Sequence, residues 1–307
     1  GKRATLWMQD LLMDLHDLDY VLSTLKLLGS RGTTGTQASF LALFDGDQEK
    51  VEALDKKISE KFGLPVFPVS GQTYPRKLDA RVLNVLGGVA ISCNRFGNDL
   101  RLLQHMREME EPFEKHQVGS SAMAYKRNPM RCERICSLSR FVTAQMQNPA
   151  MTASVQWLER TLDDSANRRL SIAESFLAAD AVLCLMLNVT DGMVVYEKII
   201  QRRLKEFLPF LATENILMEA VKRGGDRQKL HEKIRLHSME SSRLMKEEGL
   251  DCDLASRLAA DPDFGMSLEQ IYDVLDPKLY IGRCPEQVTS FLQNEVWPVV
   301  QGAKAVK

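Results

Sequence analysis

The stretch Gly119–Pro129 reads Gly-Ser-Ser-Ala-Met-Ala-Tyr-Lys-Arg-Asn-Pro, so its eleven residues contain two adjacent serine hydroxyls, two cations and a side-chain amide. Upstream, a long apolar-periodic run ends near Glu111-Pro112. Downstream, Pro129 is suited to the first position of a helix, because the N–H it lacks would have no partner there. The stretch therefore predicts a loop that runs into a helix N-terminus, where backbone N–H groups favour anions. A connector with solvated basic residues is the alternative on composition alone.

The sequence on both sides of this loop predicts long helices. Apolar residues recur at helical spacing from Arg76 to about Met109, from Met130 to Gln147 and from about Ala166 to Val189. Runs of this length exceed ordinary globular helices and favour an all-α bundle. Beyond residue 191 the helices become shorter and are interrupted by prolines and glycines. We therefore predict a long-helix domain at 1–191, with its loop at 112–129, and a smaller helical domain at 192–307.

Two further helices are expected before the first long run. The first covers Gly1–Leu28, with Gly29 able to end it, and the second begins at an Asp47 cap and ends at Gly63. The chain starts without methionine inside the first of these helices, and we expect it to be a fragment. In the longest run, Gly87, Gly88 and Gly97 lower helix propensity but permit close helix packing.

Composition limits the classes of function. The chain has 307 residues and a formal net charge of -1, so no bulk binding to nucleic acid or to a membrane surface is expected. We also expect no apolar run long enough to span a bilayer. The six cysteines include no Cys-x-x-Cys pair, which favours free thiols in a reducing compartment and a cytoplasmic protein. Cys132 and Cys136 share a helix face, but packing explains them better than a metal site.

Two polar segments besides the loop are candidates for ligand binding. Ser165 can cap the third long helix, and Arg169, one turn further on, can bind an anion at that helix N-terminus. Gln72 lies in a polar turn before the longest helix. Solvated surface residues are the alternative in both cases. The loop's two serines lack an adjacent His–Asp pair, and no Gly-x-Ser-x-Gly elbow occurs, so a hydrolase of that type is excluded.

Three segments together resemble one enzyme family. Ser120–Asn128 is similar to the Ser-Ser-x-Met-Pro-x-Lys-x-Asn signature of the fumarase/aspartase superfamily, with Ala124 in place of the proline. The flanking residues 112–115 and 129–134 resemble its adenylosuccinate lyase branch in the animal form. Residues 157–169, Trp-Leu-Glu-Arg-Thr-Leu-Asp-Asp-Ser-Ala-Asn-Arg-Arg, resemble that family's substrate-binding segment.

The resemblance implies a function in purine nucleotide biosynthesis. Such lyases release fumarate by β-elimination from adenylosuccinate, giving AMP, and from the succinyl-carboxamide ribotide SAICAR, giving AICAR. It implies an all-α homotetramer with active sites shared between subunits, and no metal or redox cofactor. It makes Ser120 the general base, and it assigns substrate binding to Gln72, Lys126, Asn128, Arg134, Arg160, Ser165 and Arg169.

The general acid is expected to lie outside this chain. In the family it is a histidine just upstream of the helix that opens the sequence. Of the chain's five histidines, only His116 lies near the serines, and it does not match that acid. A catalytically inactive bundle that only oligomerises is therefore one alternative. Another lyase of the superfamily, such as argininosuccinate lyase, is the second, although residues 157–169 favour a phosphorylated nucleotide.

Overall fold

The computed structural model describes residues 1–114, 122–123 and 125–302, and these form two units, Arg3–Val194 and Val195–Lys307 with Gly1–Lys2. We call them the bundle unit and the C-terminal unit. The division lies three residues beyond the predicted boundary at 191/192. Helices dominate both units, in agreement with the predicted all-α fold, and the described strands are one short pair, β1 (Met109–Glu110) and β2 (Val194–Val195).

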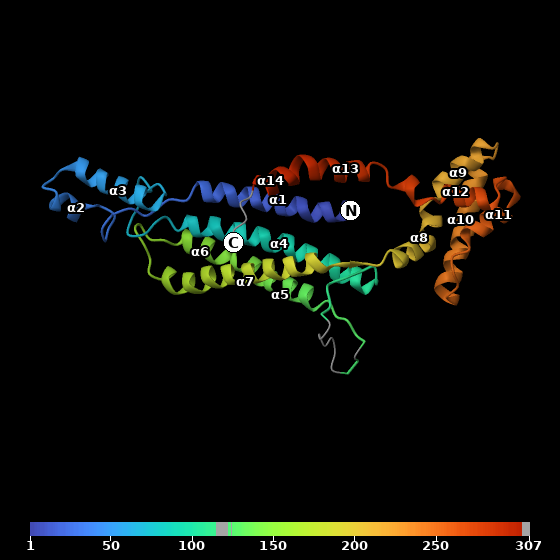
Figure 1. Ribbon diagram of the computed structural model, residues 1–307, viewed down its shortest axis with the longest axis horizontal. Coiled ribbons are helices and arrows are strands. Elements are labelled where there is room, and N and C mark those ends of the chain that lie inside the picture. Colours follow the sequence, from blue (N-terminus) through green and yellow to red (C-terminus); the bar gives the residue numbers. More distant parts are fainter. Residues whose placement is uncertain (115–121, 124, 303–307) are drawn as a thin grey trace. The chain divides into compact units, whose positions relative to one another are not determined.

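The bundle unit contains seven helices among its described residues (Figure 1). Their bounds are α1 (Lys2–Ser23), α2 (Ala38–Leu43), α3 (Gln48–Phe62), α4 (Lys77–His105), α5 (Met130–Gln145), α6 (Gln147–Ser154) and α7 (Asp164–Gly192). Asp47 caps α3 by accepting from Lys50 N at 3.1 Å, and Gly63 ends that helix with φ 68°, as predicted.

Helix α4 packs against α5, α6 and α7. Its direction relative to α5 and α7 shows at which end of the bundle unit α5 begins. Arg76, at its start, pairs with Asp164 at the start of α7, and Cys93 meets Met186 further along, so α4 and α7 run parallel. Gly97 faces the first turns of α5, whereas Gly87 faces Met146 just beyond its end. Helix α5 therefore runs antiparallel to both, and the three helices lie side by side in Figure 1.

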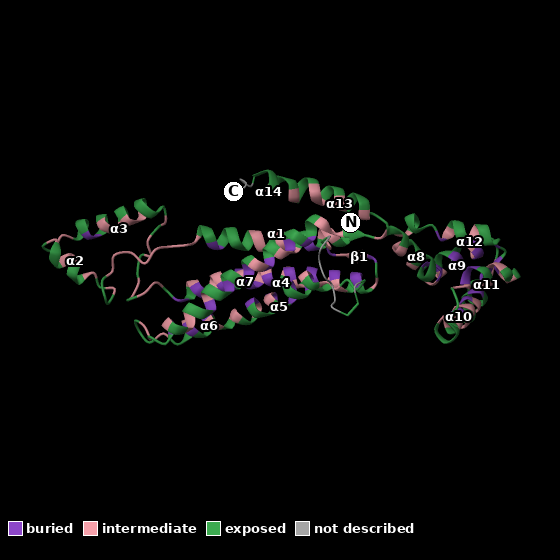
Figure 2. Ribbon diagram, turned by 60° about the horizontal axis from the view of Figure 1, so that its bottom comes forward, coloured by how far each residue is buried: buried purple, intermediate pink, exposed green. Residues whose placement is uncertain are grey.

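The core of the bundle unit lies between α1, α4, α5 and α7, and Figure 2 colours buried residues along α4, α5 and α7. Trp7 packs edge-on against Phe96 with ring centroids 5.0 Å apart. A Cβ on Gly97 would lie 2.9 Å from Cys136 Sγ and 3.2 Å from Cys132 O, so this glycine allows the close approach of α4 and α5. The two cysteines that share a helix face thus serve packing.

Helix α7 contradicts the expectation that no apolar run is long enough to span a bilayer. By length and composition it could cross a membrane, although a third of the relevant window is already buried within the bundle unit. The core helix of a bundle meets the same criteria. Its outward face remains apolar, with large side chains exposed at Leu170, Phe176, Leu177, Leu183 and Leu187.

Several helix ends differ from the predictions. Helix α1 ends at Ser23 and not near Leu28, because Leu27 pairs with Val66 in an extended bridge. Pro129 precedes the first helical residue of α5 and does not occupy it. Asn148-Pro149 does not stop the helical path, since Pro149 is accommodated in the first turn of α6, where a missing N–H costs little.

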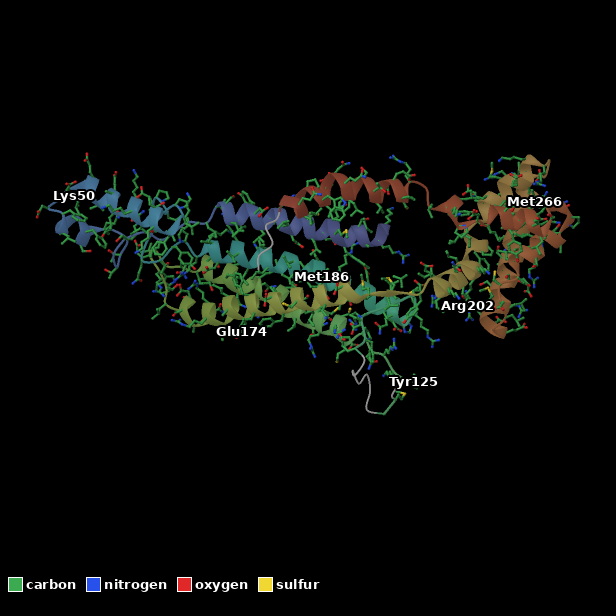
Figure 3. All side chains as sticks on the ribbon, viewed as in Figure 1. Lys50, Tyr125, Glu174, Met186, Arg202 and Met266 are labelled. Atoms are coloured by element: carbon green, nitrogen blue, oxygen red, sulfur yellow. The ribbon has the colours of Figure 1, made fainter. Side chains whose placement is uncertain are left out.

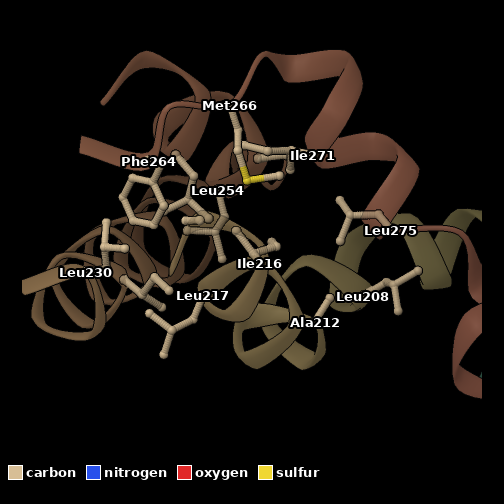
Figure 4. Packing of buried hydrophobic residues seen from close by; sticks show 14 residues of the cluster. Leu208, Ala212, Ile216, Leu217, Leu230, Leu254, Phe264, Met266, Ile271 and Leu275 are labelled. Atoms are coloured by element: carbon tan, nitrogen blue, oxygen red, sulfur yellow. The ribbon is translucent and has the colours of Figure 1, made fainter. Parts of the chain in front are cut away.

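The C-terminal unit contains the shorter helices. They are α8 (Glu197–Leu211), α9 (Thr213–Lys222), α10 (Arg227–Arg243), η1 (Leu244–Glu248), α11 (Leu254–Ala260), η2 (Pro262–Phe264), α12 (Leu268–Val274), η3 (Pro277–Tyr280), α13 (Cys284–Phe291), η4 (Leu292–Val296) and α14 (Trp297–Gly302). Figure 4 shows its apolar core, in which Ile216, Leu254 and Phe264 are almost fully buried.

Asp261 is the polar centre of the C-terminal unit. It accepts a hydrogen bond from Lys233 Nζ at 2.7 Å, and its other carboxylate oxygen lies 3.0 Å from His237 Nε2. Burial alone would raise the pKa of Asp261, but the hydrogen bonds from Lys233 and His237 outweigh it and lower the pKa to about 2. The ionised carboxylate therefore stabilises the folded unit.

We expect Asp261→Asn to reduce stability near neutral pH by about 2–3 kcal/mol, because the folded pKa lies well below the unfolded value of about 3.9. The sign follows from this depression: the contribution is fully present above the unfolded pKa and is lost as the pH falls through about 4 towards about 2. Urea midpoints of wild type and variant should converge over that range. Asp273→Asn, at an exposed position of α12, is the control, and an equal pH-dependent difference there would contradict the assignment.

Candidate functional site

The predicted site residues divide between the two ends of the bundle unit. Gln72, Arg160, Ser165 and Arg169 lie at the end where α4 and α7 begin, whereas Lys126, Asn128 and Arg134 lie in or after the loop that joins the other end. Ser120 lies outside the described residues, as do Ser121 and Ala124. The 29 residues of α4 connect the two ends and rise about 40 Å.

The starts of α4 and α7 are held together by a network of charged side chains. Arg76 donates to Asp164 at 2.6 Å and Arg160 donates to its other oxygen at 3.1 Å. Arg168 donates to Asp79 at 2.6 Å. Burial by itself would raise the pKa of Asp164, but the hydrogen bonds from Arg160 and Arg76 hold it below its usual range. Three arginines thus surround two buried carboxylates, so this network carries a net charge of one positive unit.

Tyr74 ties the polar turn before α4 to this network. Its hydroxyl donates to Asp79 at 2.6 Å and accepts from Arg168, while the guanidinium groups of Arg76 and Arg168 lie 4.8 and 5.5 Å from its ring centroid. Burial, followed by the neighbouring Asp79, raises the pKa of the Tyr74 phenol. Gln72 lies two residues earlier in the same turn and is exposed.

Ser165 and Arg169 form a pair on the first turn of α7. Arg169 Nη1 donates to the carbonyl oxygen of Ser165 at 2.7 Å and also to its hydroxyl oxygen. Ser165 therefore does not cap the helix as predicted, because α7 already begins at Asp164 and the serine lies inside its first turn. The guanidinium of Arg169 is exposed and folds back to the helix N-terminus, which suits contact with an anion.

Two glycines bring neighbouring turns together at this end. A Cβ on Gly71 would lie 2.7 Å from a carboxylate oxygen of Glu159, so the Gln72 turn contacts the segment that carries Arg160. Gly35, at φ 82°, lies against the backbone of Ser70 and Gly71. The Gly-Thr turn at 31–37 is thereby placed beside the same residues, and its Arg31 pairs with Asp55 of α3 at 3.3 Å.

The loop end presents a different set of groups (Figure 3). Lys126 is exposed, Asn128 is half-buried and Arg134 is exposed one turn into α5. Figure 3 labels Tyr125 on this loop and Glu174 in the first half of α7, and the two lie well apart. One chain therefore does not bring Lys126 and Asn128 together with Arg160 and Arg169. Among the described residues, no group of three or more His, Cys, Asp or Glu side chains is arranged to hold a metal ion.

Sequence reasoning missed Glu111. Its buried carboxylate accepts from the backbone N–H of Arg131 at 3.0 Å and of Cys132 at 2.9 Å, on the helix that follows the loop. Glu111 and α5 are separated by the whole loop, so helix-start rules based on neighbouring residues could not find this cap. The one sequence signal was that Pro129 has no side-chain acceptor of its own.

Comparison with known proteins gives concordant matches. The family model described as "Lyase" matches residues 1–143, and "Adenylosuccinate lyase C-terminus" matches residues 209–291. The chain is 51% identical over 297 residues to the adenylosuccinate lyase of Saccharomyces cerevisiae, covering 96% of this chain and 62% of the relative. It is 45% identical to that of Schistosoma mansoni, covering 99% and 64%. The chain thus spans less than two thirds of these curated relatives.

Solved structures match in fold at lower identity. The 3-carboxy-cis,cis-muconate lactonizing enzyme of Pseudomonas putida aligns with a TM-score of 0.79 at 19% identity, over 95% of this chain and 62% of that one. A fumarate lyase from Mesorhizobium aligns with a TM-score of 0.76 at 19% identity, over 96% and 63%. At 19% identity, these two structures show the fold of the chain and not its function.

Proposed function

We propose that the chain is part of an adenylosuccinate lyase, because the family models "Lyase" and "Adenylosuccinate lyase C-terminus" match it and curated adenylosuccinate lyases are 45% and 51% identical to it over nearly its whole length. The enzyme would release fumarate from adenylosuccinate and from SAICAR by β-elimination. The observation that carries the proposal is the cluster of predicted nucleotide-binding groups at the start of α7, where Arg160, Ser165 and Arg169 lie beside the Gln72 turn.

The reaction needs three groups. A base removes a weakly acidic proton from Cβ, donors stabilise the charge that develops on the adjacent carboxylate, and an acid protonates the departing nitrogen. We assign Ser120 as the base, with Lys126 and Asn128 holding the succinyl carboxylates. A serine hydroxyl ionises only with nearby cations and N–H donors, and in this proposal Lys126 and the loop backbone supply them. The acid would be a histidine from outside this chain.

We further propose a homotetramer whose active sites combine residues from different subunits. Within one chain, the run of α4 places about 40 Å between the loop end and the arginine end, and this separation supports sites that combine the two ends from different subunits. The exposed leucines of α7 support burial against a second copy, because covering each such side chain stabilises by about 1.5–3 kcal/mol. The free cysteines support a cytoplasmic location.

The proposed function is tested in a protein completed to the length of the matched relatives, called here the completed protein. It should convert adenylosuccinate to AMP and fumarate, followed by absorbance. Arg169→Ala should weaken nucleotide binding by about 1.5–3 kcal/mol, because a charge-assisted contact is lost, whereas Ser121→Ala should cost about 1. Calorimetry with adenylosuccinate, with both changes made in a Ser120→Ala background, measures both.

The alternatives predict different results. Argininosuccinate is the control substrate, and fumarate formed from it in preference to adenylosuccinate would assign the chain to another lyase of the superfamily. Binding of AMP without any turnover would indicate an inactive bundle. Equal dissociation constants for Arg169→Ala and Ser121→Ala would contradict the assignment of a phosphate contact to Arg169.

A further inference from the structure

We propose that Glu111 is a positioning residue, which fixes the two ends of the segment that carries the catalytic serine. The proposal rests on the function proposed above and extends it to a group that does not touch substrate. Glu111 is 4% exposed and its carboxylate receives two N–H donors of α5, Arg131 N at 3.0 Å and Cys132 N at 2.9 Å.

These two donors are the ones that an N-cap side chain normally satisfies. Pro129 occupies the N-cap position of α5 and offers no side-chain acceptor. Glu111 supplies that acceptor from the other side of the loop, and its negative charge lies where the helix dipole favours an anion. The two hydrogen bonds to Glu111 therefore cap α5 and also join the two ends of the loop.

Two neighbouring side chains, those of Gln104 and Arg131, reinforce this junction. Gln104 Nε2 donates to Arg127 O at 3.3 Å, and its Oε1 accepts from Glu111 N at 3.3 Å. The Arg131 guanidinium donates to Pro112 O and to Glu114 at 3.1 Å. We call Glu111, Gln104 and Arg131 the clasp.

A further ion pair joins the same two chain ends. Arg127 pairs with Glu110 at 3.2 Å, and its guanidinium lies 5.0 Å from the Phe113 ring centroid. Residues on both sides of the loop are thus tied to one another at successive positions. Gly192, at the end of α7, completes the support, because a Cβ there would come within 2.6 Å of Pro112 Cβ.

The clasp has a consequence for catalysis. Seventeen residues lie between Pro112 and Met130 and include Ser120, so we expect the orientation of the serine to depend on where those two ends are held. A displacement of a reacting group by about 1 Å can cost about 100-fold in rate. Arg160 and Arg169, two of the arginines assigned to the substrate, lie at the other end of the bundle unit and do not depend on the clasp.

The test is Glu111→Gln in the completed protein. This change keeps the size of the side chain but turns one of its two acceptor oxygens into a donor that faces a backbone N–H. We expect kcat to fall by about 10- to 100-fold, while the dissociation constant for AMP changes less than about twofold. Trypsin should also cut faster after Lys115, Lys126 or Arg127, because the loop's ends are released.

Two other variants separate positioning from general loss of stability. Asp226→Ala removes a capping carboxylate from α10, a helix of similar length in the C-terminal unit, where Asp226 accepts from Lys229 N at 2.8 Å. It should lower the melting temperature and leave kcat unchanged. Arg131→Met keeps both backbone donors for Glu111 and removes only the guanidinium contacts, so its kcat should fall less than that of Glu111→Gln. If Glu111→Gln does not fold, Arg131→Met alone still tests the clasp.

The outcomes are distinct. An unchanged kcat and unchanged tryptic cleavage in both clasp variants would overturn the proposal, as would equal losses in kcat and AMP affinity. Faster tryptic cleavage with unchanged kcat would show a clasp without a catalytic role and would also overturn it. If the wild-type completed protein does not act on adenylosuccinate, the proposed function fails, and the proteolysis comparison still tests the clasp.

Discussion

Ser120→Ala in the completed protein is expected to abolish turnover of adenylosuccinate while leaving nucleotide binding nearly intact. The serine is the hydroxyl assigned to proton removal, and a positioned general base contributes about 10²–10⁴-fold to the rate. The groups assigned to the nucleotide, Arg160 and Arg169, lie at the other end of the bundle unit and keep their hydrogen bonds to Asp164 and Ser165. Fumarate release measures the loss, and calorimetry with adenylosuccinate measures the retained binding.

Ser165→Ala is the matched control for this experiment. It also removes one hydroxyl, but from the arginine end, where that hydroxyl accepts a hydrogen bond from Arg169. Its cost should appear in the dissociation constant, at about 1 kcal/mol for a neutral contact, and not in kcat. A Ser120→Ala variant that retained substantial kcat would show that another group is the base, and the assignment of the loop's chemistry would then be wrong.

The sequence predicted helices well where local rules decide them. The Asp47 cap, the Gly63 end and the long periodic run of α4 depend on residues within a few turns of one another, and all three are confirmed. The signature also predicted which proteins the chain is similar to, since it matches adenylosuccinate lyases over nearly its whole length.

The failures occur where a distant segment determines a local structure. Residues 24–28 leave the helical path because Leu27 bonds to residues 65–67, about forty positions away. Ser165 is not a cap, because α7 begins one residue earlier, where Asp164 is held by Arg76 and Arg160. Glu111 caps α5 across a whole loop. Each depends on a contact between distant parts of the chain, and periodicity and capping rules describe only neighbours.

The separation of the candidate site residues within one chain leads to the second large effect. If each active site takes its loop from one subunit and its arginines from another, two inactive variants should restore activity when their subunits mix. We expect Ser120→Ala and Arg169→Ala, each nearly inactive at low substrate, to regain activity after co-expression. With random assortment, about a quarter of the sites would combine an intact loop with an intact arginine end.

The matched control mixes Ser120→Ala with Lys126→Ala. Both changes lie in the same loop, so every site receives one defective loop whichever subunit supplies it, and no activity should return. Recovery in the first mixture alone would support shared sites. No recovery in the first mixture, although mixed oligomers form, would mean that loop and arginines of the same subunit act together. The chain would then have to bend across the roughly 40 Å that the straight run of α4 now places between them.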